Sequence, residues 1–427
     1  MTALGARRPP GTAIEGSVDG HPVSVLPVPA TAAGHLDWVA LAASLPSPPA
    51  DGPRLPVPDG WVQIPLAGAE QTLFLAEGAR YEGIMPQVSL RHVRSTALGD
   101  LLTGDVAARW LPLGIEPWTA GAWRGVHVSW SLSRYASTVI RRQWMLDDRQ
   151  GGLWEVVAET NAYLSHHLSA VLDGMVAGIL PAPAAESGLT ADLAWSVAAA
   201  EEARGRLPAP AADGLVQASA HRGEDRDRIV SGFGADEPAW IIEAGRDHAA
   251  TVRPRLIGRV WTHGAEALVE SSAAGPETAG PETVGLGRYT RDDAADMMLR
   301  LVGHRPEGPA DVPARLLPAE EFSARLHDPT IPLPTEVPSN AEISQAMDPQ
   351  DIYRWWTADW SWWSVRRNQD GLRVLTVEGF GHYLWDGAGG VPGADGSMVR
   401  VRPVDGLTLF GALTALVGPA GASSDAS

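Results

Sequence analysis

The residue types that carry most protein chemistry are sparse in this chain. There is no cysteine among its 427 residues, which excludes disulfides, thiolate nucleophiles and cysteine-ligated zinc or iron–sulfur centres. All 33 basic residues are arginine, so a phosphate-loop lysine, a Schiff-base lysine and a Ser-x-x-Lys nucleophile pair are excluded as well. Neither a Gly-x-Ser-x-Gly elbow nor a His-Glu-x-x-His motif occurs. We therefore expect a protein that is not an enzyme, with no catalytic residues and no cofactor.

Two groups of polar residues resemble metal ligands, but structural roles explain both better. His166 and His167 are adjacent, and neighbouring side chains on a helix point about 100° apart, so the two rings cannot share a metal ion as i, i+4 histidines do. Asp292, Asp293 and Asp296 follow Thr290 in a pattern typical of a helix start. Thr290 and Asp293 are expected to form a capping box, and acids in a first turn favour the helix dipole. No metal site is predicted.

Three glycine-rich stretches resemble nucleotide or calcium loops without completing either motif. Gly232–Gly234 and Gly379–Gly381 do not extend to Gly-x-Gly-x-x-Gly. Asp386–Gly396 lacks the alternating acids and closing glutamate of an EF-hand, and it lies between two strand patterns instead of before a helix. We interpret it as a long hairpin loop. A Ser/His/Asp triad assembled from distant residues stays open, because triads are recognised by their geometry.

The most unusual stretch lies near the C-terminus, where five of the chain's 17 tryptophans fall within nine residues. The spacing predicts a helix that enters from Asp348-Pro349 and gives way to a strand near Ser361. The indoles then either form a core, since large aromatics mostly pack, or form an exposed surface for a peptide or a sugar. Trp and Arg dominate interface hot spots. The candidate partner-binding residues are accordingly Trp355, Trp356, Trp360, Trp362, Trp363, Arg354, Arg366 and Arg367.

Charge and hydropathy limit the partners. The formal net charge is −18, from 51 acidic and 33 basic residues, and such a surface repels nucleic acid and anionic lipid headgroups. No stretch approaches the roughly 18–20 apolar residues that span a bilayer. The first ten residues carry two arginines without an apolar segment after them, so we expect no secretory signal and a cytoplasmic protein. A protein partner is expected, with no nucleic acid and no membrane span.

Proline- and glycine-rich breakers divide the chain. The expected fold class is α+β, with antiparallel sheets and packed helices. The predicted segments are a Pro/Ala-rich N-terminal segment (1–51), an α+β domain (52–182), a first sheet-plus-helix module (188–304), a Pro-rich linker (305–341), a second sheet-plus-helix module (342–419) and a disordered tail (420–427).

The α+β domain resembles a known fold. The opening Pro58-Asp-Gly-Trp61, the strand that follows Met85, a central helix at Leu101–Trp110, three antiparallel strands and a closing helix are similar to the LpqN/PsbP-like fold. Members of that family are typically small non-enzymatic partners or lipoproteins. This chain departs from the lipoprotein pattern, because it has no cysteine to acylate.

The last 230 residues or so contain an apparent duplication. Trp240–Val252 resembles Trp363–Leu375, and Arg259–Gly264 resembles His382–Gly387; each repeat closes with an apolar helix ending in Leu-Val-Gly. Helices at Leu193–Leu207 and Ile343–Trp356 are expected to lead the two repeats, with one more helix at Ala319–Leu326 inside the linker. This half resembles the EspG family of type VII secretion chaperones, which have a quasi-two-fold α/β architecture and bind secretion substrates without chemistry.

These observations favour a non-enzymatic adaptor or chaperone associated with a type VII-like secretion system. Two alternatives remain. A hydrolase with a dispersed Ser/His/Asp or carboxylate site requires a histidine within reach of both a serine and an aspartate. A carbohydrate-binding protein requires exposed, parallel indoles.

Overall fold

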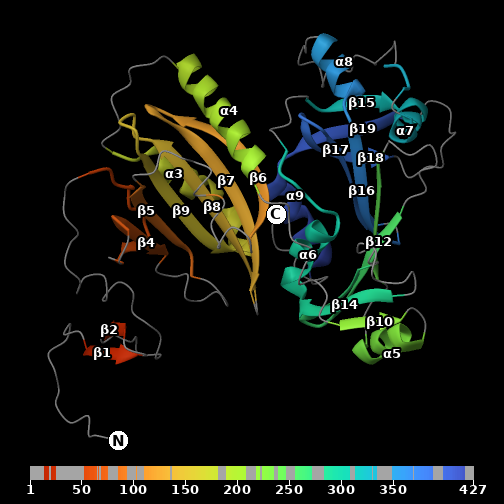
Figure 1. Cartoon of the computed structure of the whole chain (residues 1–427), viewed down its shortest axis with the longest axis horizontal. Coiled ribbons are helices and arrows are strands. Elements are labelled where there is room, and N and C mark those ends of the chain that lie inside the picture. The colour runs from red at the N-terminus through yellow and green to blue at the C-terminus, as the bar shows by residue number, and fades with distance from the viewer. Residues whose placement is uncertain are drawn as a thin grey trace, which may run out of the picture.

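A computed structural model provides the three-dimensional structure of the chain. It describes residues 14–18, 21–25, 52–64, 66, 69–75, 85–93, 102, 110–134, 137–180, 189–207, 218–221, 224–234, 239–246, 255–271, 283–307, 313–328, 330–333, 349–368, 370–387 and 398–418. The fold class is α+β, as predicted, with two sheet-containing domains (Figure 1). A short hairpin near the N-terminus, β1 (Ile14–Val18) and β2 (His21–Val25), pairs apart from both sheets.

The N-terminal domain is built on a seven-stranded antiparallel sheet in the order β3-β4-β5-β9-β8-β7-β6. The sequence pattern predicts strands at Gln71–Leu75 and Gln87–Val93, and β4 and β5 have these bounds. The alternation at residues 126–132 predicts a half-buried strand, but β7 is buried on both faces of the sheet there. The strands are β3 (Trp61–Gln63), β4 (Gln71–Leu75), β5 (Gln87–Val93), β6 (Leu111–Ala120), β7 (Trp123–Arg134), β8 (Ser137–Asp147) and β9 (Leu153–Asn161).

Two helices cover the two faces of this sheet. α3 (Ala162–Ala177) starts at Asn161, whose side chain accepts a hydrogen bond from the Leu164 N–H at 2.8 Å, as an N-cap does. Its apolar stripe, which includes Leu172 and Met175, packs in one core with Trp144. α4 (Leu189–Arg206) covers the opposite face through its small buried residues, against a core that includes Val126, Val128 and Trp130.

The C-terminal domain is built on a ten-stranded antiparallel sheet with a mirrored strand order, β10-β14-β13-β12-β11-β16-β17-β18-β19-β15. Each half contributes five strands, and the two halves join at the β11–β16 pair. The strands are β10 (Ala218–His221), β11 (Trp240–Arg246), β12 (Arg255–His263), β13 (Glu266–Ser271), β14 (Thr283–Thr290), β15 (Arg315–Pro318), β16 (Trp360–Arg367), β17 (Asp370–Val377), β18 (Gly381–Gly387) and β19 (Met398–Val404).

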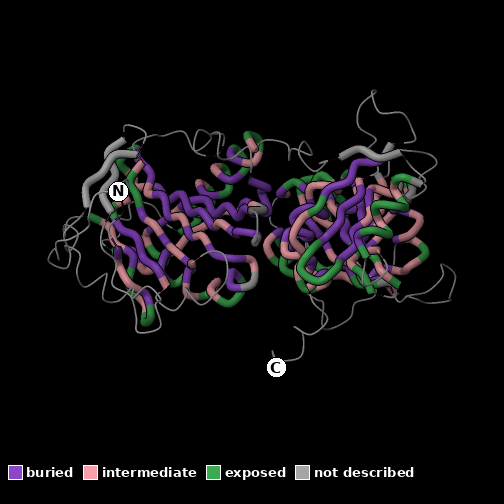
Figure 2. The backbone as a smooth tube through the Cα atoms, turned by 90° about the horizontal axis from the view of Figure 1, so that it is seen from below, coloured by how far each residue is buried: buried purple, intermediate pink, exposed green. Residues whose placement is uncertain are grey.

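The helices of this domain divide between the two faces of the ten-stranded sheet. α6 and α9 pack on the inner face of the ten-stranded sheet (Figure 1). One hydrophobic core joins them to Leu111, Leu113 and Ile140 of the N-terminal sheet, and buried residues run through both domains (Figure 2). The two domains therefore share buried apolar surface, and α6 and α9 lie between the sheets. The helices are α5 (Glu224–Phe233), η3 (Arg291–Asp293), α6 (Ala294–Leu301), α7 (Ala319–His327), α8 (Pro349–Thr357) and α9 (Gly406–Val417).

Hydrogen bonds reinforce the contact between the domains. The Ser131 hydroxyl of β7 donates to the Asp296 carboxylate of α6, and the Thr138 hydroxyl of β8 donates to Asp293 at 3.0 Å. Asp293 and Asp296 are both buried. Asp293 and Asp296, which the sequence pattern assigns to the start of a helix, thus also bind the N-terminal domain. The predicted capping box does not form, because the Thr290 hydroxyl donates to the Asp293 carboxylate, at 2.7 Å, and caps no backbone N–H.

The structure corrects the sequence analysis at several elements. The helix expected to lead the first repeat is α4, which packs on the N-terminal domain instead. The expected linker contains β15, an edge strand of the large sheet, and α7, which matches the predicted helix at Ala319–Leu326. β6 was not predicted, because Pro112, Gly114 and Pro117 read as strand breakers; as an edge strand with a bulge it tolerates them.

The duplication is present with a different alignment. Counted outward from the centre of the sheet, β12 corresponds to β17 and β13 to β18, so Arg259–Gly264 does not correspond to His382–Gly387. The longer connection between β11 and β12 shifted the sequence comparison by one strand. The predicted helix at Leu101–Trp110, most of the Asp386–Gly396 loop, the tail and most of residues 1–51 lie outside the described residues.

Candidate functional site

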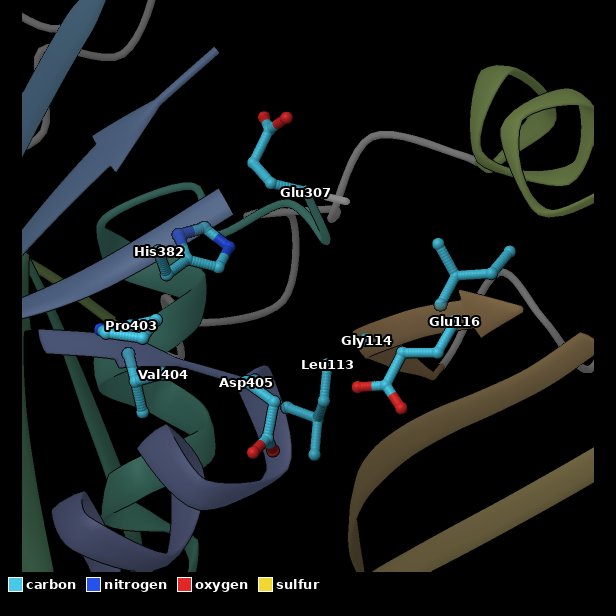
Figure 3. A pocket seen from close by; sticks show the side chains of 10 residues that line it. Leu113, Gly114, Glu116, Glu307, His382, Pro403, Val404 and Asp405 are labelled. Atoms are coloured by element: carbon cyan, nitrogen blue, oxygen red, sulfur yellow. The ribbon is translucent and has the colours of Figure 1, made fainter. Parts of the chain in front are cut away.

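A cavity of about 260 Å³ lies where the two domains meet (Figure 3). Its N-terminal wall is the edge strand β6, and its C-terminal wall is formed by the segment after α6, by β18 and by the turn from β19 into α9. The lining residues are Leu113, Gly114, Ile115, Glu116, Glu307, His382, Pro403, Val404, Asp405 and Gly406.

The floor of this interdomain cleft depends on a close approach of two backbones. Gly406, the first residue of α9, lies so near β6 that a Cβ on it would stand 1.7 Å from the Leu113 carbonyl oxygen. Only glycine permits that approach. Asp405 caps the helix, accepting from the Thr408 N–H at 2.7 Å and from its hydroxyl at 2.6 Å. The first turn of α9 is thereby fixed against the N-terminal domain.

Glu116 enters the cleft from β6 at the end of a buried polar chain. Its carboxylate lies 3.8 Å from Nδ1 of His127, which is buried between the strands. The Nε2 of that ring accepts from the Arg142 guanidinium at 3.2 Å, so Nδ1 carries the proton and points to Glu116. The guanidinium in turn contacts Asp173 of α3 at 2.7 Å.

These contacts determine the protonation states of Glu116 and His127. The contact with His127 lowers the pKa of Glu116 below its ordinary value, so the carboxylate is ionised at neutral pH. Burial lowers the pKa of His127, which keeps the ring neutral there. The Glu116 side chain is 42% exposed and extends toward the start of α9 (Figure 3). It therefore presents a negative charge to the cleft.

Glu307 lies on the other side of the cleft, on the segment that follows α6 (Figure 3). Its side chain is partly buried, and burial raises the pKa of its carboxyl group above the ordinary value. A backbone N–H at Gly379 and the charge of Arg204 on α4 offset part of that rise. Among the lining side chains, the titratable groups other than His382 are thus carboxylates.

His382 lines the cleft, and the His304 ring packs against it. The rings of His304 and His382 have centroids 4.7 Å apart. The Nε2 of His304 lies 3.1 Å from the Leu113 carbonyl oxygen, which joins the C-terminal domain to β6. The Nε2 of His382 lies 2.9 Å from the Arg305 carbonyl oxygen, and its Nδ1 lies 2.9 Å from the Thr376 hydroxyl. Because carbonyls only accept, both rings carry their proton on Nε2.

The chemistry available here is binding of a positive group. None of His92, His127, His304 and His382 hydrogen-bonds to both a hydroxyl nucleophile and a carboxylate. Within the described ranges, no group of three or more His, Asp or Glu side chains is arranged to hold a metal ion. The sequence analysis missed Glu116, Glu307, His304 and His382, since they come from separate elements and no local pattern links them.

The five tryptophans of the C-terminal cluster are buried. Trp355, Trp356, Trp360 and Trp362 pack with α7 and β15 on the outer face of the sheet, and Trp363 points to the inner core. Each is at most 9% exposed. Of the two interpretations that the sequence left open, this burial favours the core, and the parallel exposed indoles required of a sugar platform are not formed.

The arginines of the same segment lie nearer the surface, and each has a contact. Arg354 is 3.4 Å from Asp351, and Arg366 forms a two-pronged pair with Glu243 at 3.1 and 3.2 Å. The guanidinium of Arg367 stacks over Trp240 at 4.2 Å. The segment thus joins its own module to β11 of the first module.

The remaining sequence candidates have structural positions. His166 and His167 lie exposed on α3, with ring centroids 6.0 Å apart and edge-on. Gly232–Gly234 ends α5, and Gly379–Gly381 forms the turn between β17 and β18, so neither precedes a helix as a phosphate loop does. None of the described helices has the length and apolar character needed to cross a membrane.

Comparisons with solved structures give distant likenesses, among them two that are described below. No protein-family model and no curated protein sequence matches the chain. The chain is similar to LpqN, a protein of Mycobacterium tuberculosis involved in cell envelope biogenesis, at 15% identity and a TM-score of 0.24 over 30% of this chain and 81% of that one. It is also similar to PA94 of Pseudomonas aeruginosa, a protein of unknown function, at 11% identity and a TM-score of 0.19 over 41% of this chain and 100% of that one. At these scores neither likeness assigns a function.

Proposed function

We propose that this protein is a non-catalytic adaptor or chaperone that binds a polypeptide, and that the interdomain cleft receives a basic side chain of that partner. The observation that carries the proposal is the charge of the cleft: Glu116 and Glu307 line it, and no arginine is among its lining residues. The net charge of −18 extends the same preference over the whole molecule and steers a basic segment toward it.

The electrostatics of the two carboxylates support a cationic ligand. Glu116 is held ionised by His127 and is partly exposed to the cleft. Glu307 is partly buried with a raised pKa, so a further positive group beside it would stabilise its charge. A guanidinium supplies a planar set of donors that matches a carboxylate, which makes arginine a suitable ligand.

The size of the cavity limits what it can hold. Pockets for drug-sized ligands have volumes of about 300–1,000 Å³. At about 260 Å³, the cleft is suited to one extended side chain and not to a nucleotide or an oligosaccharide. The ligand is therefore better understood as one residue of a larger partner that also covers the rim.

We further propose that the protein acts in a type VII-like secretion system. The mirrored halves of the ten-stranded sheet agree with the quasi-two-fold architecture of EspG-type chaperones, and this supports a role in a type VII-like secretion system. The described residues of the cleft do not form the hydroxyl–histidine–carboxylate arrangement that a hydrolase uses. This supports binding without catalysis.

A peptide array tests this function. The array carries twelve-residue peptides with randomised flanks and a central arginine, lysine, citrulline or glutamate; citrulline keeps the shape of arginine without its charge. We expect wild-type protein to bind arginine peptides and Glu116→Gln/Glu307→Gln protein to bind them at least about tenfold more weakly, as loss of a charge-assisted contact predicts. The matched control is Glu201→Gln/Glu202→Gln, which removes two exposed acids of α4 outside the cleft. Equal binding of arginine and citrulline peptides, or undiminished binding by the cleft variant, would rule the proposal out.

A further inference from the structure

The paired rings of His304 and His382 connect three parts of the molecule. His304 follows α6 and contacts the Leu113 carbonyl of β6, on the other domain. His382, on β18, contacts the Arg305 carbonyl beside it. Both rings are buried, and the contact of His304 with Leu113 ties the segment after α6 to the N-terminal domain.

The hydrogen bonds of His304 suit a neutral ring only. His304 has its proton on Nε2, and its buried Nδ1 has no hydrogen-bond partner among the residues that the structure describes. A second proton there would create a buried donor without an acceptor, which is unfavourable, and more so for a charged group. His382 can donate from Nδ1 to Thr376, whose hydroxyl can reorient. Two charged rings at 4.7 Å would nevertheless repel each other.

From this geometry we propose that His304 and His382 form an acid-sensitive latch. Protonation of the pair releases residues 304–307 from β6 and loosens the wall of the interdomain cleft, while both sheets remain folded. The inference goes beyond the proposed function, since it depends on how the cleft is closed and not on what fills it.

Burial is the main cause of the lowered pKa of both rings. Burial lowers the pKa of His304 to about 4 and that of His382 to about 3, and the charge of His304 adds to the lowering for His382. Once released into water, both rings regain the ordinary value of 6.5. The other charged groups around the cleft are Glu116 on β6, Arg305 and Glu307 beside His304, Glu378 after β17, Asp405 before α9 and Arg204 on α4.

The size of the effect follows from proton linkage. At pH 5 a ring whose pKa rises to 6.5 on opening multiplies the opening constant about thirtyfold, and two such rings multiply it by up to about a thousandfold. The sign is set by the lowered pKa in the closed form: closure is fully stable above pH 6.5 and weakens progressively as the pH falls below it.

Hydrogen exchange by mass spectrometry at pH 7.5 and pH 5, corrected for the intrinsic rate, tests the latch. We expect the protection of amides in β6 and in residues 299–307 to fall at least about tenfold at pH 5, while β8 and β9 keep theirs. His304→Gln/His382→Gln protein should lose this acid response; if it does not fold, His304→Gln alone should reduce the response about thirtyfold. His166→Gln/His167→Gln, which removes two exposed histidines, should respond like wild type.

Three outcomes would overturn the proposal. The first is wild-type protection that is unchanged at pH 5, and the second is an undiminished acid response in the His304/His382 variants. The third is a loss of protection that extends equally through β8 and β9, since the histidines would then stabilise the whole fold and not the closure of the cleft.

Discussion

Asp296 is the residue whose replacement tests the docking of the two domains most sharply. Its side chain is fully buried, and it accepts hydrogen bonds from the Ser131 hydroxyl of the other domain and from the Arg300 guanidinium at 2.7 Å. The Arg300 side chain is itself only 10% exposed. Removing one partner of a buried ion pair typically costs about 3–5 kcal/mol, because the other charge stays buried.

We therefore expect Asp296→Ala to lower the free energy of unfolding by about 3–5 kcal/mol. Asp296→Asn should cost less, since its amide oxygen still accepts from Ser131 while the charge opposite Arg300 is lost. Urea titration followed by tryptophan fluorescence measures both, with the exposed Asp225→Asn on α5 as the matched control.

A double-mutant cycle isolates the contact that crosses the domain boundary. Residues that share a hydrogen bond show coupling energies of about 0.5–3 kcal/mol, so Asp296→Asn and Ser131→Ala should not be additive. Additive effects would refute the reasoning that Ser131 and Asp296 fasten the domains. So would an Asp296→Ala protein as stable as the control.

Three further substitutions have defined outcomes. Gly406→Ala should destabilise the protein by about 1–3 kcal/mol or more in thermal unfolding, because the added Cβ would lie 1.7 Å from the Leu113 carbonyl oxygen. Alanine ordinarily stabilises a helix relative to glycine, so a stabilised variant would contradict the close approach. Arg325→Ala should cost about 2–4 kcal/mol in urea unfolding, since the buried guanidinium donates to the Trp356 and Ala358 carbonyls at the end of α8; an unchanged midpoint would contradict this. Glu307→Gln should raise the free energy of unfolding at pH 7, and this gain should vanish below pH 4.5. The reason is that a carboxyl group with a raised pKa in the folded state destabilises that state as the pH rises from 4.5 through the raised pKa. A variant less stable than wild type at pH 7 would contradict this sign.

The sequence predicts elements well where one local pattern dominates. β4 and β5 have their predicted bounds, and α7 begins at the predicted Ala319. Local patterns fail where tertiary context decides. β6 carries two prolines and a bulge that only an edge strand accommodates, and α4 gives no local sign of which sheet it will cover.

Local sequence patterns do not predict the residues that line the cleft. Glu116 and His382 are 266 residues apart by their numbers, and they meet only because α6 and α9 dock on the edge of the N-terminal sheet. The tryptophan cluster, by contrast, was conspicuous in sequence, yet its indoles pack against α7 and β15, elements that lie in a stretch with linker composition. Conspicuous residue types thus mark a core here, and the inconspicuous acids line the cleft.

The central claim, that a polypeptide partner occupies the interdomain cleft, is tested most directly by photo-crosslinking in the native host. A benzophenone amino acid replaces Pro403, which is exposed and lines the cleft, or Glu201, which is exposed on α4 away from it. We expect a discrete crosslinked protein from position 403, lost when Glu116→Gln/Glu307→Gln is added, and none from position 201. The absence of an adduct at 403, or the same adduct from both positions, would contradict it.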